Sequence, residues 1–219
     1  MTDEPLIRWE WVVRNAPELL TRAAEHLVMT SIAISIGFAV SLGLALYVRR
    51  RRRLRAALFA IGNVAYSIPS LALFALLIPW TGLTLLTAEI ALVSYTILIL
   101  VRNILTGLAN VPDDVLDAAD GMGYGSTERL WRIELPIALP VIVAGLRIAT
   151  VTVIGLVTVT ALIGMGGLGF VIVNLGYLRF FPTAILVGAA GSVALAVATD
   201  LAFAALQRRL TPWARVRAE

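Results

Sequence analysis

The sequence contains no cysteine and no lysine, and its single histidine is His26. Without cysteine there are no disulfide bonds and no thiolate metal sites. One histidine and no HExxH motif leave no candidate zinc site, so we predict neither a bound metal nor a catalytic residue. The absence of lysine excludes a P-loop, whose lysine holds the phosphates of a bound nucleotide. If ATP drives this protein, a separate polypeptide binds it.

Apolar residues are abundant instead. The chain is 59% hydrophobic and has a mean hydropathy of +0.89, whereas soluble domains are about 45–50% apolar. The first apolar run, Leu27–Val48, is long enough to cross a bilayer, and the residues before it do not resemble a cleavable signal. For the arm 1–26, an amphipathic helix on the membrane surface and a simple extension of the first span are both open.

Five segments have the length and hydropathy of membrane-spanning helices, which need about 20 residues to cross roughly 30 Å of hydrocarbon. The alternating pattern of a β-barrel is absent from these runs. We therefore predict an all-α integral membrane protein with about five transmembrane helices. The predicted transmembrane domain is 27–206, with spans at 27–48, 56–80, 83–101, 141–163 and 184–206.

The arginines predict the orientation of these spans. Six of them lie in the linker Arg49–Arg55, and basic residues are retained on the cytoplasmic side of a membrane. The arm 1–26 and the segment 164–181 are then extracytoplasmic, and the segment 102–140 and the tail 207–219 are cytoplasmic. Because the arginines form short runs beside apolar spans, this pattern favours a membrane protein over a nucleic-acid-binding protein.

The segment 102–140 is the only long polar connection, and long loops in compact domains tend to be functional. Within it, residues 109–136 predict two short helices. The first is expected to begin at Pro112 and to end at Gly121 and Gly123. Ser126 or Thr127 is expected to cap the second.

Two prolines, Pro136 and Pro140, are expected to set the exit from this loop into the fourth span. Helices of two or three turns are unstable alone in water. They must pack either on the ends of their own bundle or in a groove of a partner protein.

The loop contains a spaced motif. Asp117-Ala118-Ala119 is followed by three intervening residues and Gly123, then by nine intervening residues and Ile133, and then by one residue and Leu135-Pro136. This pattern resembles the EAA loop of binding-protein-dependent ABC importer permeases, with aspartate in place of the usual glutamate. The resemblance implies a coupling helix that docks in a cleft of a cytoplasmic ATPase. The implied coupling residues are Asp117, Ala118, Ala119, Gly121, Gly123, Ile133, Leu135 and Pro136.

Further motifs resemble the osmoprotectant permeases within that family, which carry glycine betaine, carnitine, choline or proline betaine. They include Glu25-His26-Leu27, Ile68–Leu73, Ala144–Arg147 and Ile163–Gly169. The resemblance implies two copies of an ATP-binding subunit that holds ATP and Mg, a second permease subunit, and an extracytoplasmic binding protein. Methionine-type permeases share the fold and the loop, so a methionine permease remains an alternative.

Three ionisable residues lie inside predicted spans, where charges are costly and usually have a partner or a cavity. Arg147 and Asp200 both lie about 12 Å from the cytoplasmic side at ~1.5 Å per residue, so we predict a structural pair. Glu89 lies near the outer end of its span. It either extends towards the outer surface or faces the translocation path.

The second span contains the break Tyr66-Ser67-Ile68-Pro69-Ser70. Non-helical backbone at membrane depth persists only where protein or a water-filled path satisfies it, which favours a path-lining position over a packing kink. Aromatic faces attract quaternary ammonium groups. The candidate path residues are Tyr66, Ser67, Pro69, Ser70 and Tyr95, with Trp80 as a further aromatic.

The four glycines in Gly164–Gly169 predict close backbone approach between helices. Two other classes of protein are less consistent with the sequence. An ion-coupled secondary transporter predicts two repeated halves with paired broken helices, and no such repeat is found. A membrane-embedded enzyme predicts reactive side chains at a common depth, and none cluster there.

Overall fold

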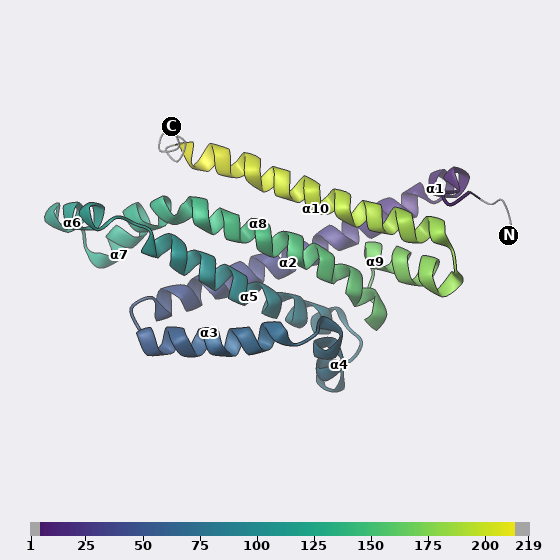
Figure 1. Ribbon diagram of the computed structural model, residues 1–219, viewed down its shortest axis with the longest axis horizontal. Helices are drawn as coiled ribbons and strands as arrows, with labels where there is room; N and C mark the ends of the chain where they lie inside the picture. Colours follow the sequence, from purple (N-terminus) through teal and green to yellow (C-terminus); the bar gives the residue numbers. More distant parts are fainter. Residues whose placement is uncertain (1–4, 213–219) are drawn as a thin grey trace.

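The apolar segments form long helices that lie side by side along the long axis of the molecule (Figure 1). The computed structural model describes residues 5–212. Within this range there is no β-strand. Four helices are long and apolar enough to cross a membrane, or five if the bent pair α3–α4 is one span. The prediction of an all-α bundle with about five spans is confirmed.

The labelled helices are α1 (Trp9–Arg14), α2 (Ala16–Val48), α3 (Arg52–Ser67), α4 (Ser70–Thr81), α5 (Leu85–Ala109), α6 (Asp113–Gly121), α7 (Ser126–Arg129), α8 (Leu135–Val159), α9 (Leu168–Phe170) and α10 (Pro182–Leu210). A π-turn, Leu130–Glu134, joins α7 to α8, and the 3₁₀ turn Thr160–Ile163 follows α8. These pieces make Ser126–Ile163 one helical segment. Likewise, α9 continues through a π-turn and a 3₁₀ turn to Arg179.

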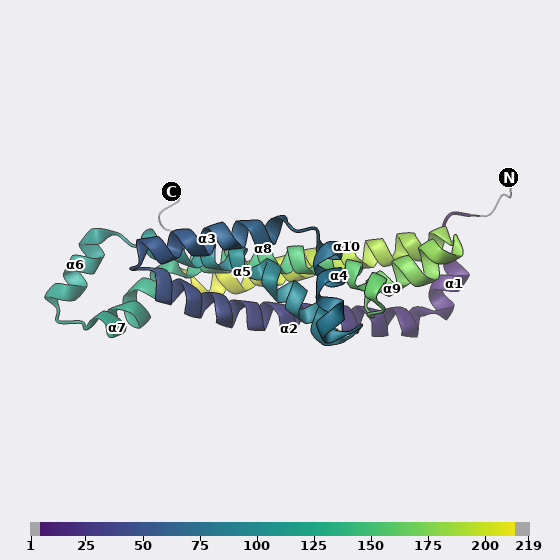
Figure 2. The ribbon, with the colours of Figure 1, turned by 90° about the horizontal axis from the view of Figure 1, so that it is seen from below.

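Helices α5 and α8 lie side by side at the centre of the bundle (Figure 1). Helix α2 packs against both, α3 and α4 lie along one flank, and α10 lies along the other (Figures 1 and 2). Helices α6 and α7 project beyond one end of the bundle. Helices α1 and α9 lie at the opposite end (Figure 2).

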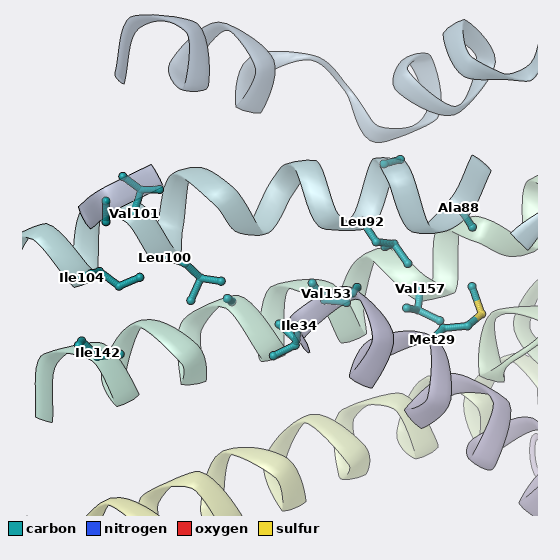
Figure 3. Packing of buried hydrophobic residues seen from close by; sticks show 14 of the residues in the cluster. Met29, Ile34, Ala88, Leu92, Leu100, Val101, Ile104, Ile142, Val153 and Val157 are labelled. Atoms are coloured by element: carbon teal, nitrogen blue, oxygen red, sulfur yellow. The ribbon is translucent and has the colours of Figure 1, made fainter. Parts of the chain in front are cut away.

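The core lies where α2, α5 and α8 meet. Leu92 and Leu100 of α5, Val153 and Val157 of α8, and Met29 of α2 are buried there (Figure 3). Glycines bring these helices together, as small residues do between membrane helices. A Cβ atom on Gly37 of α2 would lie 2.0 Å from Thr96 Oγ1, and one on Gly145 of α8 would lie 2.4 Å from Asn103 Cβ.

The glycine-rich segment after α8 also lies close to its neighbours, as predicted. Gly164 and Gly167 have φ angles of +82° and +78°, which suit glycine. A Cβ atom on Gly169 would lie 2.2 Å from the Thr158 carbonyl oxygen, and one on Gly166 would lie 2.1 Å from Glu25 Oε2. The sequence did not predict that a helical segment, Leu168–Arg179, follows these glycines.

Helix α2 begins at Ala16, before the predicted start of the first span at Leu27, so the helix is longer than the predicted span. Of the two interpretations of the N-terminal arm, extension of the span holds from residue 16 onward. A separate helix covers only Trp9–Arg14, and residues 1–4 lie outside the described range. Charged residues near the start of α2 form ion pairs along its surface, such as Arg22 with Glu18, and so favour the helix there.

The second predicted span, 56–80, is not one straight helix. It divides into α3 and α4, which meet at an angle of 97°. The bend falls at the predicted break, where Ile68 and Pro69 are extended, with ψ angles of 126° and 136°. Pro69 has no amide hydrogen to donate, and it disfavours a helical backbone conformation at Ile68. Both effects account for the position of the bend.

The helices that contain the third and fourth predicted spans extend beyond the predicted span bounds on the loop side. Helix α5 continues to Ala109, because Arg102 is accommodated outside the core: its guanidinium donates to Asn63 Oδ1 at 2.8 Å. Pro136 lies in the first turn of α8, close to its predicted place, and Pro140 lies inside that helix, although the helical segment already begins at Ser126. Proline has no amide hydrogen to donate, and the π-turn Leu130–Glu134 changes the hydrogen-bond pattern just before Pro136 so that the helix continues.

The fifth predicted span, 184–206, corresponds to α10, which extends beyond it at both ends. The predicted tail 207–219 therefore begins inside a helix. Residues 213–219 lie outside the described range, including Arg215 and Arg217.

Replacing Gly169 with alanine tests the close approach at the start of α9. We expect Gly169→Ala to lower the free energy of unfolding by about 1–3 kcal/mol, because the added methyl overlaps the backbone of Thr158. Gly155→Ala is the matched control, since no atom lies within 4 Å of the added methyl. The measurement is the thermal unfolding midpoint of the purified protein in detergent. Equal midpoints for the two variants would contradict the packing described here.

Candidate functional site

Helices α6 and α7 form the part of the chain that projects furthest from the bundle (Figure 2). Helix α6 begins with Asp113 and Asp114, whose charges favour the positive end of the helix dipole. Pro112 precedes the helix in an extended conformation, so its predicted place as the first helical residue is off by one. The helix ends at Gly121 as predicted, and Gly123 follows with a φ of +84°.

The second helix, α7, is preceded by Gly125, and no side chain caps it. The predicted caps, Ser126 and Thr127, are its first two residues instead. The helix is short because it continues directly through the π-turn into α8. Unbroken helical backbone therefore connects α7 to α8, so a movement of the α6–α7 pair can be passed to a central helix of the bundle.

The residues of the EAA-like motif divide into an exposed tip and a packed base. At the tip, Asp117, Ala118, Gly121 and Gly123 are exposed, whereas Ala119 is fully buried. At the base, the side chains of Ile133, Leu135 and Pro136 are half-buried. Met122, between the two glycines, is 69% exposed. The tip thus presents acidic and small residues, together with the exposed Met122, to its surroundings.

A carboxylate that the sequence did not single out holds this base in place. Glu134, in the π-turn, accepts a hydrogen bond from Arg49 at 2.8 Å and another from Arg129 at 3.1 Å. Arg129 also forms an ion pair with Asp120 of α6. The side chain of Glu134 is only 9% exposed. These contacts connect the end of α6, the start of α8 and the end of α2.

The predicted path residues around the helix break are brought together in part. The Tyr95 hydroxyl of α5 donates to the Ile68 carbonyl, which the break leaves without a helical partner. The rings of Tyr66 and Tyr95 meet edge to face with centroids 5.7 Å apart. Ser67 and Pro69 are exposed and Ser70 is half-buried at this bend. Trp80, at the end of α4, is 75% exposed.

Arg147 and Asp200 are in contact, as predicted. The Nε and Nη2 atoms of Arg147 donate to the two carboxylate oxygens of Asp200 at 2.7 and 2.8 Å. This two-point geometry favours a fixed orientation. The pair joins α8 to α10 and borders a recess of about 400 Å³ that Ile148, Val151 and Thr152 also line.

Glu89 is buried in the interior of the bundle. Glu89 is 8% exposed, and neither of its carboxylate oxygens has a hydrogen-bond partner among residues 5–212. The interpretation that Glu89 extends towards the outer surface is therefore wrong. The spacing of apolar residues around position 89 did not distinguish a buried side chain from an exposed one.

A second cluster that the sequence did not predict lies at the opposite end of the bundle. His26 is fully buried, with Nε2 3.0 Å from the Ile154 carbonyl oxygen and Nδ1 accepting from the Leu168 amide at 3.3 Å. Glu25 accepts from the Gly167 amide at 2.9 Å. These bonds attach the glycine-rich segment to α2 and α8. The sequence signals were the Glu25-His26-Leu27 motif and the glycines of Gly164–Gly169, and nothing in either indicated that the two meet.

No group of three or more His, Asp or Glu side chains within residues 5–212 is arranged to hold a metal ion.

A bundle of membrane-length helices with one projecting helix pair is the architecture of a multi-pass membrane protein. The profile of the family described as "Binding-protein-dependent transport system inner membrane component" matches residues 29–212. The chain belongs to this family. It is thus a multi-pass permease subunit of a binding-protein-dependent ABC importer.

Relatives with assigned names share about a third of their residues with the chain. The choline transport system permease protein OpuBB of Bacillus subtilis is 34% identical over 93% of each chain. The glycine betaine/carnitine/choline permease protein OpuCB of the same species is 34% identical over 90% of this chain and 91% of the relative. The osmoprotectant import permease protein OsmW of Salmonella typhimurium is 32% identical over 92% and 96%.

Solved structures share the fold. An inward-facing form of the MetNI methionine ABC transporter matches 88% of this chain and 96% of its own, with a TM-score of 0.80 and 25% identity. An amino acid ABC transporter solved with histidines matches 95% of this chain and 100% of its own, with a TM-score of 0.77 and 17% identity. At 17% identity, the similarity to the amino acid transporter shows a shared fold and nothing more.

A double-mutant cycle tests the structural role of the Arg147–Asp200 pair. We expect Arg147→Met and Asp200→Leu each to lower the thermal unfolding midpoint, because each leaves an unpaired charge at membrane depth. The double variant should recover much of that loss, since both charges are gone. Additive losses would show that the two side chains are not coupled.

Proposed function

We propose that this permease imports quaternary-amine osmoprotectants such as glycine betaine, carnitine or choline. The names of relatives that align with about nine-tenths of the chain support this substrate class. The Tyr66–Tyr95 pair at the helix break adds a local argument, because aromatic faces attract quaternary ammonium groups. The path along this break is formed by Tyr66, Ser67, Pro69, Ser70 and Tyr95.

The observation that carries the coupling proposal is the projection of α6 and α7 beyond the bundle (Figure 2). Of the two predicted locations for these helices, a groove on a partner suits their exposed tip better than the ends of their own bundle. The partner is a cytoplasmic ATPase present in two copies, which binds ATP and Mg. The acidic tip, with Asp117 exposed, suits a cleft that offers basic groups.

This proposal includes an orientation. The coupling helices and the Arg49–Arg55 linker lie on the cytoplasmic side of the bacterial inner membrane, and the N-terminus lies outside. The opposite end, with α1 and α9, faces an extracytoplasmic binding protein. A second permease subunit completes the translocation path, because five helices are too few to enclose a sealed path alone.

The transport cycle follows from these contacts. Closure of the two ATPase subunits on ATP moves the coupling helices towards each other. The Glu134 contacts transmit that movement to α2 as well as to α8, since Arg49 lies just after α2. The path then opens towards a loaded binding protein. Hydrolysis of ATP by the partner resets it, and this chain performs no catalysis.

Uptake into membrane vesicles that contain the whole transporter tests the energy source. We expect import of labelled glycine betaine to stop when ATP is depleted and to persist when an uncoupler removes the ion gradient. Loss of uptake with the uncoupler alone would instead favour an ion-coupled transporter. Titration of the binding protein with glycine betaine, choline and methionine tests the substrate class, and selective binding of methionine would favour the alternative permease.

Substitution of Gly123 tests the coupling role. A leucine at the φ of +84° is strained by about 1–3 kcal/mol, so the turn between α6 and α7 should change shape and disfavour the coupled state by roughly 5- to 150-fold. We expect uptake to fall while ATPase activity and membrane insertion persist.

Gly125→Leu is the matched control for Gly123→Leu. It adds the same side chain two residues away, again with no atom within 4 Å of the new Cβ, at an ordinary φ of −68°. We expect this control to keep more uptake per ATP hydrolysed than Gly123→Leu. Normal uptake by Gly123→Leu would refute the coupling role.

A further inference from the structure

A recess of about 190 Å³ lies where the end of α2, the start of α3 and the end of α5 meet. Its polar lining is Arg49, Arg50, Arg55, Arg129 and Glu134. Leucine and alanine side chains of α5 form its apolar wall. A water molecule occupies about 30 Å³ in the liquid. The recess therefore has room for a group several times larger than water.

A second recess, of about 410 Å³, adjoins the first along α5. The two share Arg55, Leu105 and Ala109 as lining residues. The second adds Phe59 of α3 and Arg102 of α5. Together they form a groove between α3 and α5, which we call the arginine groove.

Positive charge in the arginine groove exceeds what its single carboxylate can balance. Glu134 already accepts hydrogen bonds from Arg49 and Arg129. Within residues 5–212, the side chain of Arg102 has a hydrogen bond to Asn63 and a contact with the ring of Phe59, whose centroid lies 5.6 Å from the guanidinium carbon, and no carboxylate partner.

The other two arginines of the groove are Arg50 and Arg55. Within residues 5–212, neither forms an ion pair or a hydrogen bond through its side chain. Three guanidinium groups of the groove, those of Arg50, Arg55 and Arg102, therefore lack a carboxylate partner.

The combination of guanidinium groups with an apolar wall limits the chemistry of the ligand. Guanidinium groups bind phosphate through paired hydrogen bonds. The wall formed by Leu105, Leu108 and Phe59 suits hydrocarbon rather than a fully hydrated anion. A ligand that satisfies both has a phosphate at one end and an apolar chain at the other.

We propose that the arginine groove binds the phosphate headgroup of an anionic phospholipid, with the first part of its acyl chains against Leu105, Leu108 and Phe59. The inference rests on the orientation in the proposed function, which places the groove at the cytoplasmic leaflet. Basic recesses between helices on that side are suited to anionic headgroups. The bound phosphate balances the positive charge of Arg50, Arg55 and Arg102, which no carboxylate among residues 5–212 pairs with.

Native mass spectrometry of the full-length chain in detergent, titrated with phosphatidylglycerol or with phosphatidylcholine, tests the site. We expect one phosphatidylglycerol to be retained at concentrations where phosphatidylcholine is not. Arg50→Gln with Arg55→Gln should weaken retention on the order of 30-fold, at about five-fold for each arginine.

The control variant is Arg52→Gln with Arg53→Gln. It removes the same charge from the same linker, but neither residue lines the groove. We expect it to retain phosphatidylglycerol like the unmodified chain. Equal loss in both double variants would overturn the proposal in favour of general attraction to a basic surface.

Two further results would also overturn the proposed site. Equal retention of the two lipids by the unmodified chain would exclude headgroup recognition, and this comparison needs no variant. Displacement of the lipid by millimolar inorganic phosphate would indicate a site for a soluble anion. None of these measurements requires ATP, substrate or a partner subunit, so they succeed or fail independently of the uptake experiments.

Discussion

The structure depends on one constraint: inside a bilayer no water is available to satisfy polar groups, so the chain must do so itself. The helix break shows the consequence most directly. The carbonyl of Ile68, released by the bend before Pro69, receives the hydroxyl of Tyr95 from the neighbouring helix. The same requirement explains the two-point contact between Arg147 and Asp200. Each of these contacts also fixes the position of one helix against another.

Close packing follows from the same constraint, because helices in lipid associate without a hydrophobic driving force between them. Contacts therefore rely on small residues that let backbones approach. Gly37 and Gly145 do this in the centre of the bundle, and Gly169 does it beside α8. His26 reinforces the last contact by bonding to backbone atoms of both segments. The end of the bundle near α9 is thus held by packing and hydrogen bonds together.

The opposite end is built differently. Helices α6 and α7 stand clear of the bundle, and charged contacts centred on Glu134 connect their base to it (Figure 1). A projecting helix pair joined to a central helix by continuous backbone is suited to receive movement from a partner. The surplus of arginine beside this base is available for phosphate groups of the membrane.

Much of the fold followed from the sequence because its signals are local. The apolar runs predicted the number and order of the spans, and Pro69 predicted the break. Gly121 and Gly123 predicted the end of the first loop helix. The predicted ends of the helices were less accurate, because a helix can continue through a charged residue such as Arg102 when a neighbour accepts its hydrogen bond. Hydropathy reports the composition of a segment and not its contacts.

The amino-acid sequence alone determined the class of the protein, the loop that resembles a coupling helix, and the absence of a P-loop lysine. Spacing along two helices also predicted that Arg147 and Asp200 meet. Only the tertiary structure decided that Glu89 is buried and that Glu134 is bonded to Arg49, eighty-five residues away in the chain. Such contacts depend on how helices rotate and cross, which is set by the packing of all of them together.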